Sequence, residues 1–262
     1  MKLGMNTVIF GMTDLDTALQ HVAYAGYENV ELSAIAGMAE HVAPDADAAQ
    51  VKELVASHGL TATAMEAATN DRERLGKLLV LAGQIGIGIV NIGSGGAAGE
   101  EDSTKAAIEL MRDFAKMAGD AGVLLAVKPH VGQAIYNAAT GLRLMEEVDE
   151  SAIGLNFDPS HLARADDDPA QVAPRWGDKI ITSHFRDCPV RVPGPPGTPE
   201  QQIPGRGALD LPAILGALKS INYSGPINLE VIGTSEYSLP RAMVVAAESR
   251  GYLRRVLQEI GV

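Results

Sequence analysis

The sequence predicts a single α/β domain, a closed (β/α)8 TIM barrel in which a parallel eight-stranded barrel is surrounded by outer helices. Two observations lead to this prediction. The chain has 262 residues, and one barrel of this kind typically needs about 250. Short apolar or β-branched runs also alternate eight times with longer segments of helical spacing, which is the pattern of βα units around a parallel sheet.

The strands are expected to begin at fairly regular intervals, with helix start and stop residues between them. The predicted starts lie near Leu3, Asn29, Leu60, Gly88, Val123, Ile153, Ile180 and Pro226. Thr13 or Asp14 is expected to open the first helix and Gly26 to close it. Asn70 is expected to open the third helix, and Gly122 follows the fourth. An open doubly wound sheet is the alternative, although such sheets more often have about five or six strands.

One connection departs from the βα pattern. Between Asp187 and Leu209 the chain has six prolines and four glycines, too many of both for a helix. Loops this long in compact domains are usually functional or disordered. Because it follows the seventh strand, the segment 187–209 is expected to cover the mouth of the barrel, and an inert surface excursion is the alternative.

Composition limits the partners. The formal net charge of −12 opposes a phosphate backbone, so we expect no nucleic-acid partner. No run of about 18 apolar residues is present, so we expect no membrane partner. The single cysteine, Cys188, cannot form an internal disulfide, and the first residues lack the pattern of an export signal. These features predict a cytoplasmic protein, and the 4% aromatic content predicts a mainly aliphatic core.

In such a barrel the chemistry is carried by the carboxyl ends of the strands and the loops that follow them. The polar residues at these ends, in strand order, are Asn6, Glu31, Glu66, Asn91, Lys128, His130, Asp158, His161, His184, Arg186, Asp187 and Glu230. Asn6 and Glu31 can equally be hydrogen-bonding partners of neighbouring loops, and Glu66 can cap the third helix.

Four of these residues have the chemistry of metal ligands and come from adjacent strands: Asp158, His161, His184 and Glu230. Carboxylate and imidazole donors suit a divalent ion such as Mn2+, Mg2+, Co2+ or Zn2+. The sequence therefore predicts a divalent metal site, and a purely hydrogen-bonded polar network is the alternative.

Along essentially its whole length the chain resembles the xylose isomerase-like TIM barrel superfamily, the sugar phosphate isomerase/epimerase family. The resemblance rests on GYENVEL, HGL, GLNFDPSHL, ITSHFRD, PGRGALDLPAILGAL and YSGPINLE, in that order. The superfamily includes ketose 3-epimerases, hydroxypyruvate isomerase, inosose dehydratase and isomerases, and the endonuclease IV nucleases. The resemblance implies a small-molecule sugar or polyol substrate, and a homo-oligomer would be usual.

The resemblance also implies roles for individual residues. The family's sugar epimerases hold one divalent ion with a Glu, an Asp, a His and a Glu at the ends of strands five to eight. Asp158, His184 and Glu230 match the last three positions. His161 matches a histidine that contacts substrate, and Arg186 matches a basic residue that touches the sugar.

The fifth-strand position departs from the family pattern, because Lys128 stands where the glutamate is expected. An ammonium about 4 Å from a divalent ion would be strongly repelled. His130, two residues further on and facing the same side, is a candidate replacement ligand. Alternatively, Lys128 takes the place of the metal with its charge balanced by Asp158 and Glu230, or it acts as a base or carbonyl nucleophile with a lowered pKa.

The implied reaction is isomerase or epimerase-like proton transfer next to a carbonyl of a keto-sugar, inosose or related polyol, assisted by a divalent metal. The catalytic candidates are Glu230, Lys128 and His161; the substrate-binding candidates are Asn6, Glu66, His130 and Arg186; the ligands are Asp158, His184, Glu230 and, as a further candidate, His130. Two alternatives remain open, a lyase acting on 3-keto-glycosides by elimination and a catalytically degenerate sugar-binding or partner subunit.

Two further readings are less favoured. The nuclease branch uses extra histidines, whereas Glu66 and Asn91 occupy the relevant strand ends. Arg186, Arg191 and Arg206 bracket the long loop and could receive a substrate phosphate. No glycine-rich phosphate cradle follows the seventh strand, so exposed arginines on a polar loop are the simpler interpretation.

Overall fold

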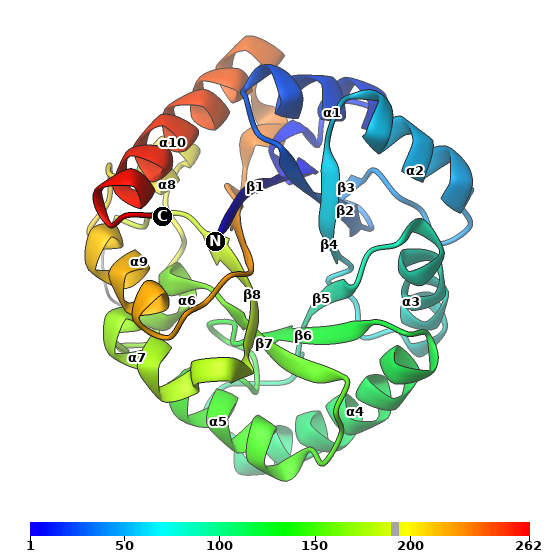
Figure 1. Ribbon diagram of the computed structural model, residues 1–262. Coiled ribbons are helices and arrows are strands. Elements are labelled where there is room, and N and C mark those ends of the chain that lie inside the picture. Colours follow the sequence, from blue (N-terminus) through cyan, green and yellow to red (C-terminus); the bar gives the residue numbers. More distant parts are fainter. Residues whose placement is uncertain (190–193) are drawn as a thin grey trace.

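The computed structural model describes residues 1–189 and 194–262. Its strands are β1 (Lys2–Asn6), β2 (Asn29–Ile35), β3 (Ala39–Glu40), β4 (Thr61–Glu66), β5 (Ile89–Gly93), β6 (Leu124–Lys128), β7 (Ile153–Phe157), β8 (Ile180–Phe185) and β9 (Pro226–Leu229). All except β3 pair in parallel with their neighbours, and β1 pairs with both β2 and β9, which closes the barrel (Figure 1). The closed eight-stranded barrel is confirmed, and the open-sheet alternative is wrong.

The predicted strand starts agree with the structure to within one residue. The pattern did not indicate β3, a two-residue strand that pairs antiparallel with the end of β2. It lies beyond the parallel ladder and therefore leaves the barrel order unchanged.

Helices surround the barrel and connect its strands (Figure 1). They are α1 (Leu15–Tyr24), α2 (Ala48–Ser57), α3 (Arg72–Ile85), α4 (Glu101–Asp120), α5 (Ala138–Glu147), α6 (Pro159–Arg164), α7 (Pro169–Trp176), α8 (Pro199–Gln202), α9 (Leu211–Ser220) and α10 (Leu239–Glu259), with short 3-10 helices η1 (Thr7–Phe10), η2 (Gly177–Lys179) and η3 (Thr234–Glu236). Within the described residues, no helix is long and apolar enough to cross a membrane.

The helix boundaries follow the local signals with one exception. Asp14 caps α1, and Gly26 follows that helix with a φ of 85°, a backbone conformation that glycine adopts without strain. Gly122 follows α4 with a φ of 71°. The prediction that Asn70 opens the third helix is wrong by one residue, because Asp71 accepts the backbone N–H three residues later at 2.7 Å.

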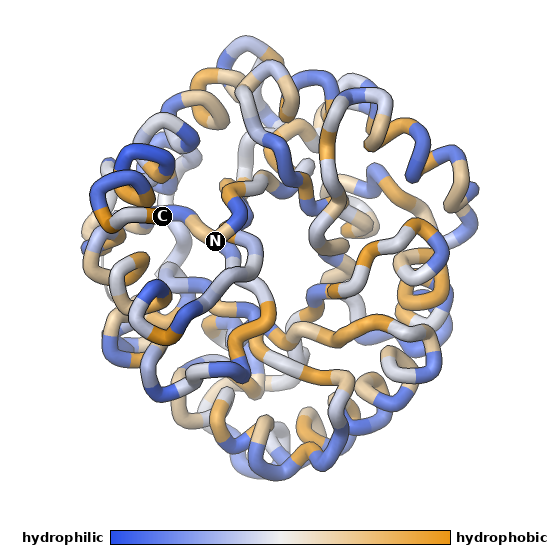
Figure 2. The backbone as a smooth tube through the Cα atoms, viewed as in Figure 1, coloured by the Kyte–Doolittle hydropathy of each residue, from blue (hydrophilic) through white to orange (hydrophobic). Residues whose placement is uncertain are grey.

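The core lies between the outer face of the barrel and the helices. It is mainly aliphatic, as predicted, and its largest fully buried side chains include Trp176, Phe10, Phe114, Phe157 and Phe185. The outer helices change from hydrophobic to hydrophilic within each turn (Figure 2), which is the pattern of helices that bury one face. A rigid, well-packed scaffold therefore supports the strand ends.

The segment 187–209 contains a short helix, α8, where the proline and glycine content predicted none. Thr198 and Gln201 form a reciprocal capping box at its start, and Pro199 occupies the first helical position, where its fixed φ and missing N–H are tolerated. The proline thus helps to begin this helix.

Asp187 ties the two ends of this segment together. Its Oδ1 accepts the N–H groups of Cys188 at 2.9 Å and Leu209 at 3.1 Å, and its Oδ2 accepts that of Gly205 at 3.0 Å. The covering role of 187–209 stays a prediction, and residues 190–193, with Arg191 among them, lie outside the described residues.

Candidate functional site

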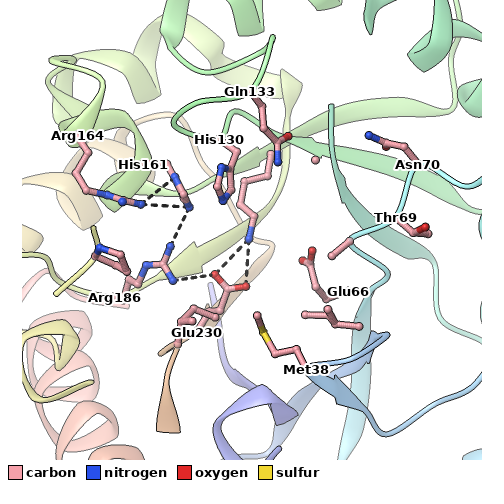
Figure 3. Close-up of a pocket in the computed structure, with 16 residues that line it drawn as sticks. Met38, Glu66, Thr69, Asn70, His130, Gln133, His161, Arg164, Arg186 and Glu230 are labelled. Carbon is pink, nitrogen blue, oxygen red and sulfur yellow. Dashed lines mark hydrogen bonds and ion pairs between the residues drawn. The ribbon is translucent and has the colours of Figure 1, made fainter. Parts of the chain in front are cut away.

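A pocket of about 290 Å³ opens among the carboxyl ends of the strands. Glu66 ends β4, Lys128 ends β6, Arg186 follows β8 and Glu230 follows β9, and all four side chains line this pocket (Figure 3). Each residue is at most 6% exposed. Parallel strands bring these side chains to one rim although the sequence separates them widely.

The ammonium group of Lys128 lies at the centre of this cluster. Its Nζ is 3.1 and 3.2 Å from the two carboxylate oxygens of Glu230 and 3.0 Å from Nδ1 of His184. Burial opposes the charge on Lys128, but Glu230 and Glu66 outweigh that effect and raise its pKa above the ordinary value. This direction is opposite to the lowered pKa that a lysine base or nucleophile needs, and that alternative stays a prediction.

A buried chain of side chains positions His184 from the other side. Nε2 of His184 is 2.7 Å from Glu31 Oε2, and Oε1 of Glu31 accepts a hydrogen bond from Asn91. Asn156 in turn donates to Asn91 at 3.0 Å. Glu31 thus contacts the imidazole, and Asn91 holds Glu31 in place. Neither Glu31 nor Asn91 lines the pocket.

The carboxylates give this cluster a strong preference for positive charge. Burial lowers the pKa of His184, but Glu230 and Glu31 raise it to about 10. Burial raises the pKa of Glu230, but His184 and Lys128 hold it well below the ordinary value. Glu230 Oε1 lies 3.1 Å from Lys128 Nζ and 3.3 Å from His184 Nδ1, so this carboxylate stabilises positive charge on both groups.

Glu66 differs from the other carboxylates of the pocket. Burial raises its pKa to about 7, although Lys128 and His184 act in the opposite direction. A carboxyl group with such a pKa can both accept and release a proton near neutral pH. Glu66 does not cap α3, because Asp71 does.

Three predicted metal ligands meet in the structure. Asp158, His184 and Glu230 each present a donor atom within 4.8 Å of the other two. Oδ2 of Asp158 is buried and makes no hydrogen bond within the described residues, and the nearby cation is Arg186, whose Nη2 lies 3.6 Å away. This donor set fits a divalent ion in kind, but Lys128 already contacts two of its members. Binding of an ion must therefore displace these contacts.

His161 and His130 lie on the opposite side of the pocket from Glu66 (Figure 3). Their rings stack with centroids 3.9 Å apart. Burial and Arg186 hold the pKa of His161 well below its ordinary value, so its ring is neutral. His130 belongs to neither group of potential metal ligands found among the described residues.

The remaining sequence candidates lie outside the pocket. Asn6 caps η1 by accepting the N–H of Val8. Arg206 is 46% exposed in its side chain and forms an ion pair with Glu248 at 2.6 Å, so it faces away from the cluster.

Sequence reasoning missed Arg164, which is buried and lines the pocket. It lies three residues after His161 on α6, and its Nη2 is 3.0 Å from the ring Nδ1 of that histidine. This helical spacing was the available signal. Gln133, Asn70 and Thr69 also line the pocket and carried no recognisable signal.

Buried carboxylates and histidines at the carboxyl ends of the strands are typical of barrel enzymes, whose active sites lie at this end. Residues 19–256 match the model of the family described as xylose isomerase-like TIM barrel. The chain belongs to this family.

Its similarity to curated relatives is distant and partial. It is 21% identical over 155 residues to an inosose dehydratase of Clostridium botulinum, covering 55% of this chain and 51% of the relative. It is 24% identical over 142 residues to an inosose isomerase of Bacillus subtilis, covering 53% and 51%. The chain thus spans about half the length of the curated relatives it matches, and these relatives are enzymes.

Solved structures resemble the chain over nearly its whole length. A structure of the IOLI protein with a zinc atom superposes with a TM-score of 0.80 at 18% identity, covering 99% of both chains. A D-allulose 3-epimerase from Methylomonas sp. superposes with a TM-score of 0.77 at 18% identity, covering 98% of both. At this identity the likeness shows the fold.

Proposed function

We propose that the chain is an isomerase or epimerase-type enzyme that moves a proton on a carbon next to a carbonyl of a keto-sugar, inosose or related polyol. The observation that carries this proposal is the meeting of Glu66, Lys128 and Glu230 in one small buried pocket. Such a reaction needs a base of matched pKa and a group that stabilises the enediolate oxygen. Glu66 and Lys128 supply these two functions.

Glu66 is the proton-transfer group in this proposal. Its pKa of about 7 lets the carboxylate take a proton from the substrate carbon and the resulting acid return it. Glu230 is less suited to this task, because its pKa is held well below the ordinary value. We therefore assign Glu230 to holding Lys128 in place.

Lys128 stabilises the oxygen that becomes negatively charged. Its ammonium has three N–H groups, and the two carboxylate oxygens of Glu230 accept two of them. The third is available to a substrate oxygen in the pocket. Both ring nitrogens of His161 face N–H donors, so we assign His161 to orienting Arg186 rather than to moving a proton.

A divalent ion, if held by Asp158, His184 and Glu230, would further polarise the substrate oxygens. Mn2+, Mg2+, Co2+ and Zn2+ are the candidates, and the zinc atom in the IOLI structure supports this reading. Metal analysis of purified protein tests the ligand assignment. Bound ion is expected in the wild type and lost in both Asp158→Ala and Glu230→Ala, and its persistence in both variants would contradict the assignment.

Elimination is the second candidate reaction, because the curated relatives include inosose dehydratases. The same enolate expels a hydroxyl or glycosidic group from the β-carbon, so a 3-keto-glycoside would release its aglycone. This outcome requires the same base and oxyanion partner, and only the fate of the intermediate differs.

Solvent exchange tests both reactions together. The protein is incubated in deuterated water with a panel of keto-sugars, inososes and 3-keto-glycosides, and mass spectrometry follows deuterium uptake, dehydration and aglycone release. Uptake with isomer formation supports the leading proposal, and dehydration or aglycone release supports elimination. Glu66→Gln should abolish exchange, whereas Glu259→Gln on the exposed end of α10 should not. No exchange with any compound would favour the degenerate sugar-binding subunit.

A further inference from the structure

One wall of the pocket is built from cationic and imidazole side chains. Arg164, His161 and Arg186 gather there, across the pocket from Glu66 (Figure 3). Only 4% of Arg164 and 2% of Arg186 are exposed. Arg164 lies on α6 and Arg186 directly follows β8, so the scaffold of the barrel sets both positions.

The two guanidinium groups are not neutralised alike. Arg186 has ion pairs with Asp158 at 3.6 Å and Glu230 at 3.4 Å. Arg164 is bonded to neutral groups, which are the backbone oxygens of Ser160 and Gly194 and the ring of His161. Among the ion pairs within residues 1–189 and 194–262, none joins Arg164 to a carboxylate.

A buried charge without a counter-ion is energetically unfavourable. Burial and the neighbouring charge of Arg186 both lower the pKa of Arg164, which reflects this environment. The wall therefore has room for one more negative charge.

The hydrogen bonds of the wall also indicate an anion site, because the wall has more N–H donors than acceptors. The ring nitrogens of His161 face Arg186 Nη2 at 2.8 Å, Arg164 Nη2 at 3.0 Å and the N–H of Val131 at 3.2 Å. A neutral imidazole accepts at only one nitrogen. Nη1 of Arg186 is buried and forms no hydrogen bond within the described residues, although it lies 3.4 Å from Glu230 Oε2. A bound anionic oxygen would supply the missing acceptor.

We propose that the wall formed by Arg164, His161 and Arg186 binds a carboxylate or phosphate group of the substrate, so that the site acts on an anionic sugar or polyol derivative. Guanidinium groups suit the oxygens of both anions. Arg186 also contacts Glu230, so an anion on this wall places the neighbouring carbons beside Lys128 and toward Glu66. Only this placement of the reacting carbon rests on the proposed function.

Binding of matched polyols tests the proposal without turnover. Glucitol is the neutral probe, gluconate the carboxylate and glucitol 6-phosphate the phosphate, each titrated by calorimetry at constant ionic strength. We expect at least one charged probe to bind the wild type ten-fold or more tightly than glucitol. Which charged probe binds more tightly identifies the anion.

Variants then locate the preference. Arg164→Gln should remove it, Arg164→Lys should keep part of it, and Arg255→Gln on exposed α10 should leave it intact. Equal affinity of the wild type for all three probes, or a preference that survives in Arg164→Gln, would overturn the proposal. Circular dichroism checks folding, and if Arg164→Gln does not fold, the wild-type comparison and Arg164→Lys decide.

The result is separable from that of the proposed reaction. Deuterium exchange into a neutral keto-sugar, with no preference among the three probes, would leave the reaction standing and remove the anion wall. A clear preference for charged probes, with no exchange into any carbonyl compound, would support the anion wall and contradict the proposed reaction.

Discussion

Replacement of Lys128 by methionine is expected to strengthen divalent-ion binding. Nζ of Lys128 lies 3.1 Å from Glu230 Oε1, and a metal–carboxylate bond is about 2.1 Å long. An ion bound by that oxygen is therefore at most about 5 Å from Nζ. At this separation and an effective dielectric constant near 20, an ammonium and a divalent ion repel each other by about 7 kcal/mol.

The measured gain should be smaller than this repulsion, because a lysine side chain can turn away when an ion enters. We expect roughly 3 kcal/mol, which corresponds to about 100-fold tighter binding. Lys128→Glu, which adds a third carboxylate to those of Asp158 and Glu230, should bind more tightly still. Without metal, Lys128→Met should be less stable than the wild type, because Glu230 loses one of its buried cationic partners.

Calorimetric titration of chelator-treated protein with Mn2+ and Zn2+ measures this effect. Lys105→Met is the control, because Lys105 is an exposed residue of α4. Adding Asp158→Ala to Lys128→Met should cancel the gain. If Lys128→Met binds the ion no more tightly than the wild type, or if the gain survives loss of Asp158, the ion does not occupy this cluster.

Three other perturbations test separate parts of the site. With a Glu66 pKa of about 7, the ionised fraction of the base increases as pH rises, so exchange in the wild type should increase between about pH 6 and 8; wild-type exchange that does not change over this range would exclude Glu66 as the base. Glu31→Gln should weaken metal binding by about 10 to 100-fold in titration, because Glu31 orients His184; unchanged affinity would refute this positioning role. Asp187→Ala should lower the free energy of unfolding in urea by about 2 to 4 kcal/mol, because three backbone N–H groups lose their acceptor; a loss below about 0.5 kcal/mol would show that these bonds are replaced by water.

The barrel could be predicted because its strands are marked locally. Parallel strands buried on both faces read as short apolar runs, and turns such as the one before Ile153 or the glycine before Ile89 delimit them. Strand starts were therefore accurate. The short strand β3 and the helix α8 could not be predicted, because the first has two residues and the second depends on a capping box within a proline-rich segment.

The site was predictable only where strand order alone determines proximity. Asp158, His184 and Glu230 come from neighbouring strands, so their convergence followed from the barrel. The support of His184 by Glu31 crosses the barrel, and no spacing in the sequence indicates it. The pocket-facing direction of Arg164 likewise depends on how α6 packs after β7.

Lys128 and Arg164 both make the charge of the site more positive. Glu31, Asp158 and Glu230 provide three buried carboxylates, and Lys128, Arg164 and Arg186 provide three buried cations. His184, whose pKa is raised to about 10, adds to the positive side, and Glu66 is only partly ionised near neutral pH. A glutamate in place of Lys128 would make this balance more negative by two charges and so favour a metal ion. With lysine there, an entering metal ion meets a cluster that is already neutral, whereas an anionic substrate meets Arg164, which has no carboxylate partner within the described residues. Preference for an anion, and metal binding weaker than a glutamate at position 128 would give, are therefore expected together. Lys128→Glu should increase the affinity for the metal ion and decrease the affinity for the anion.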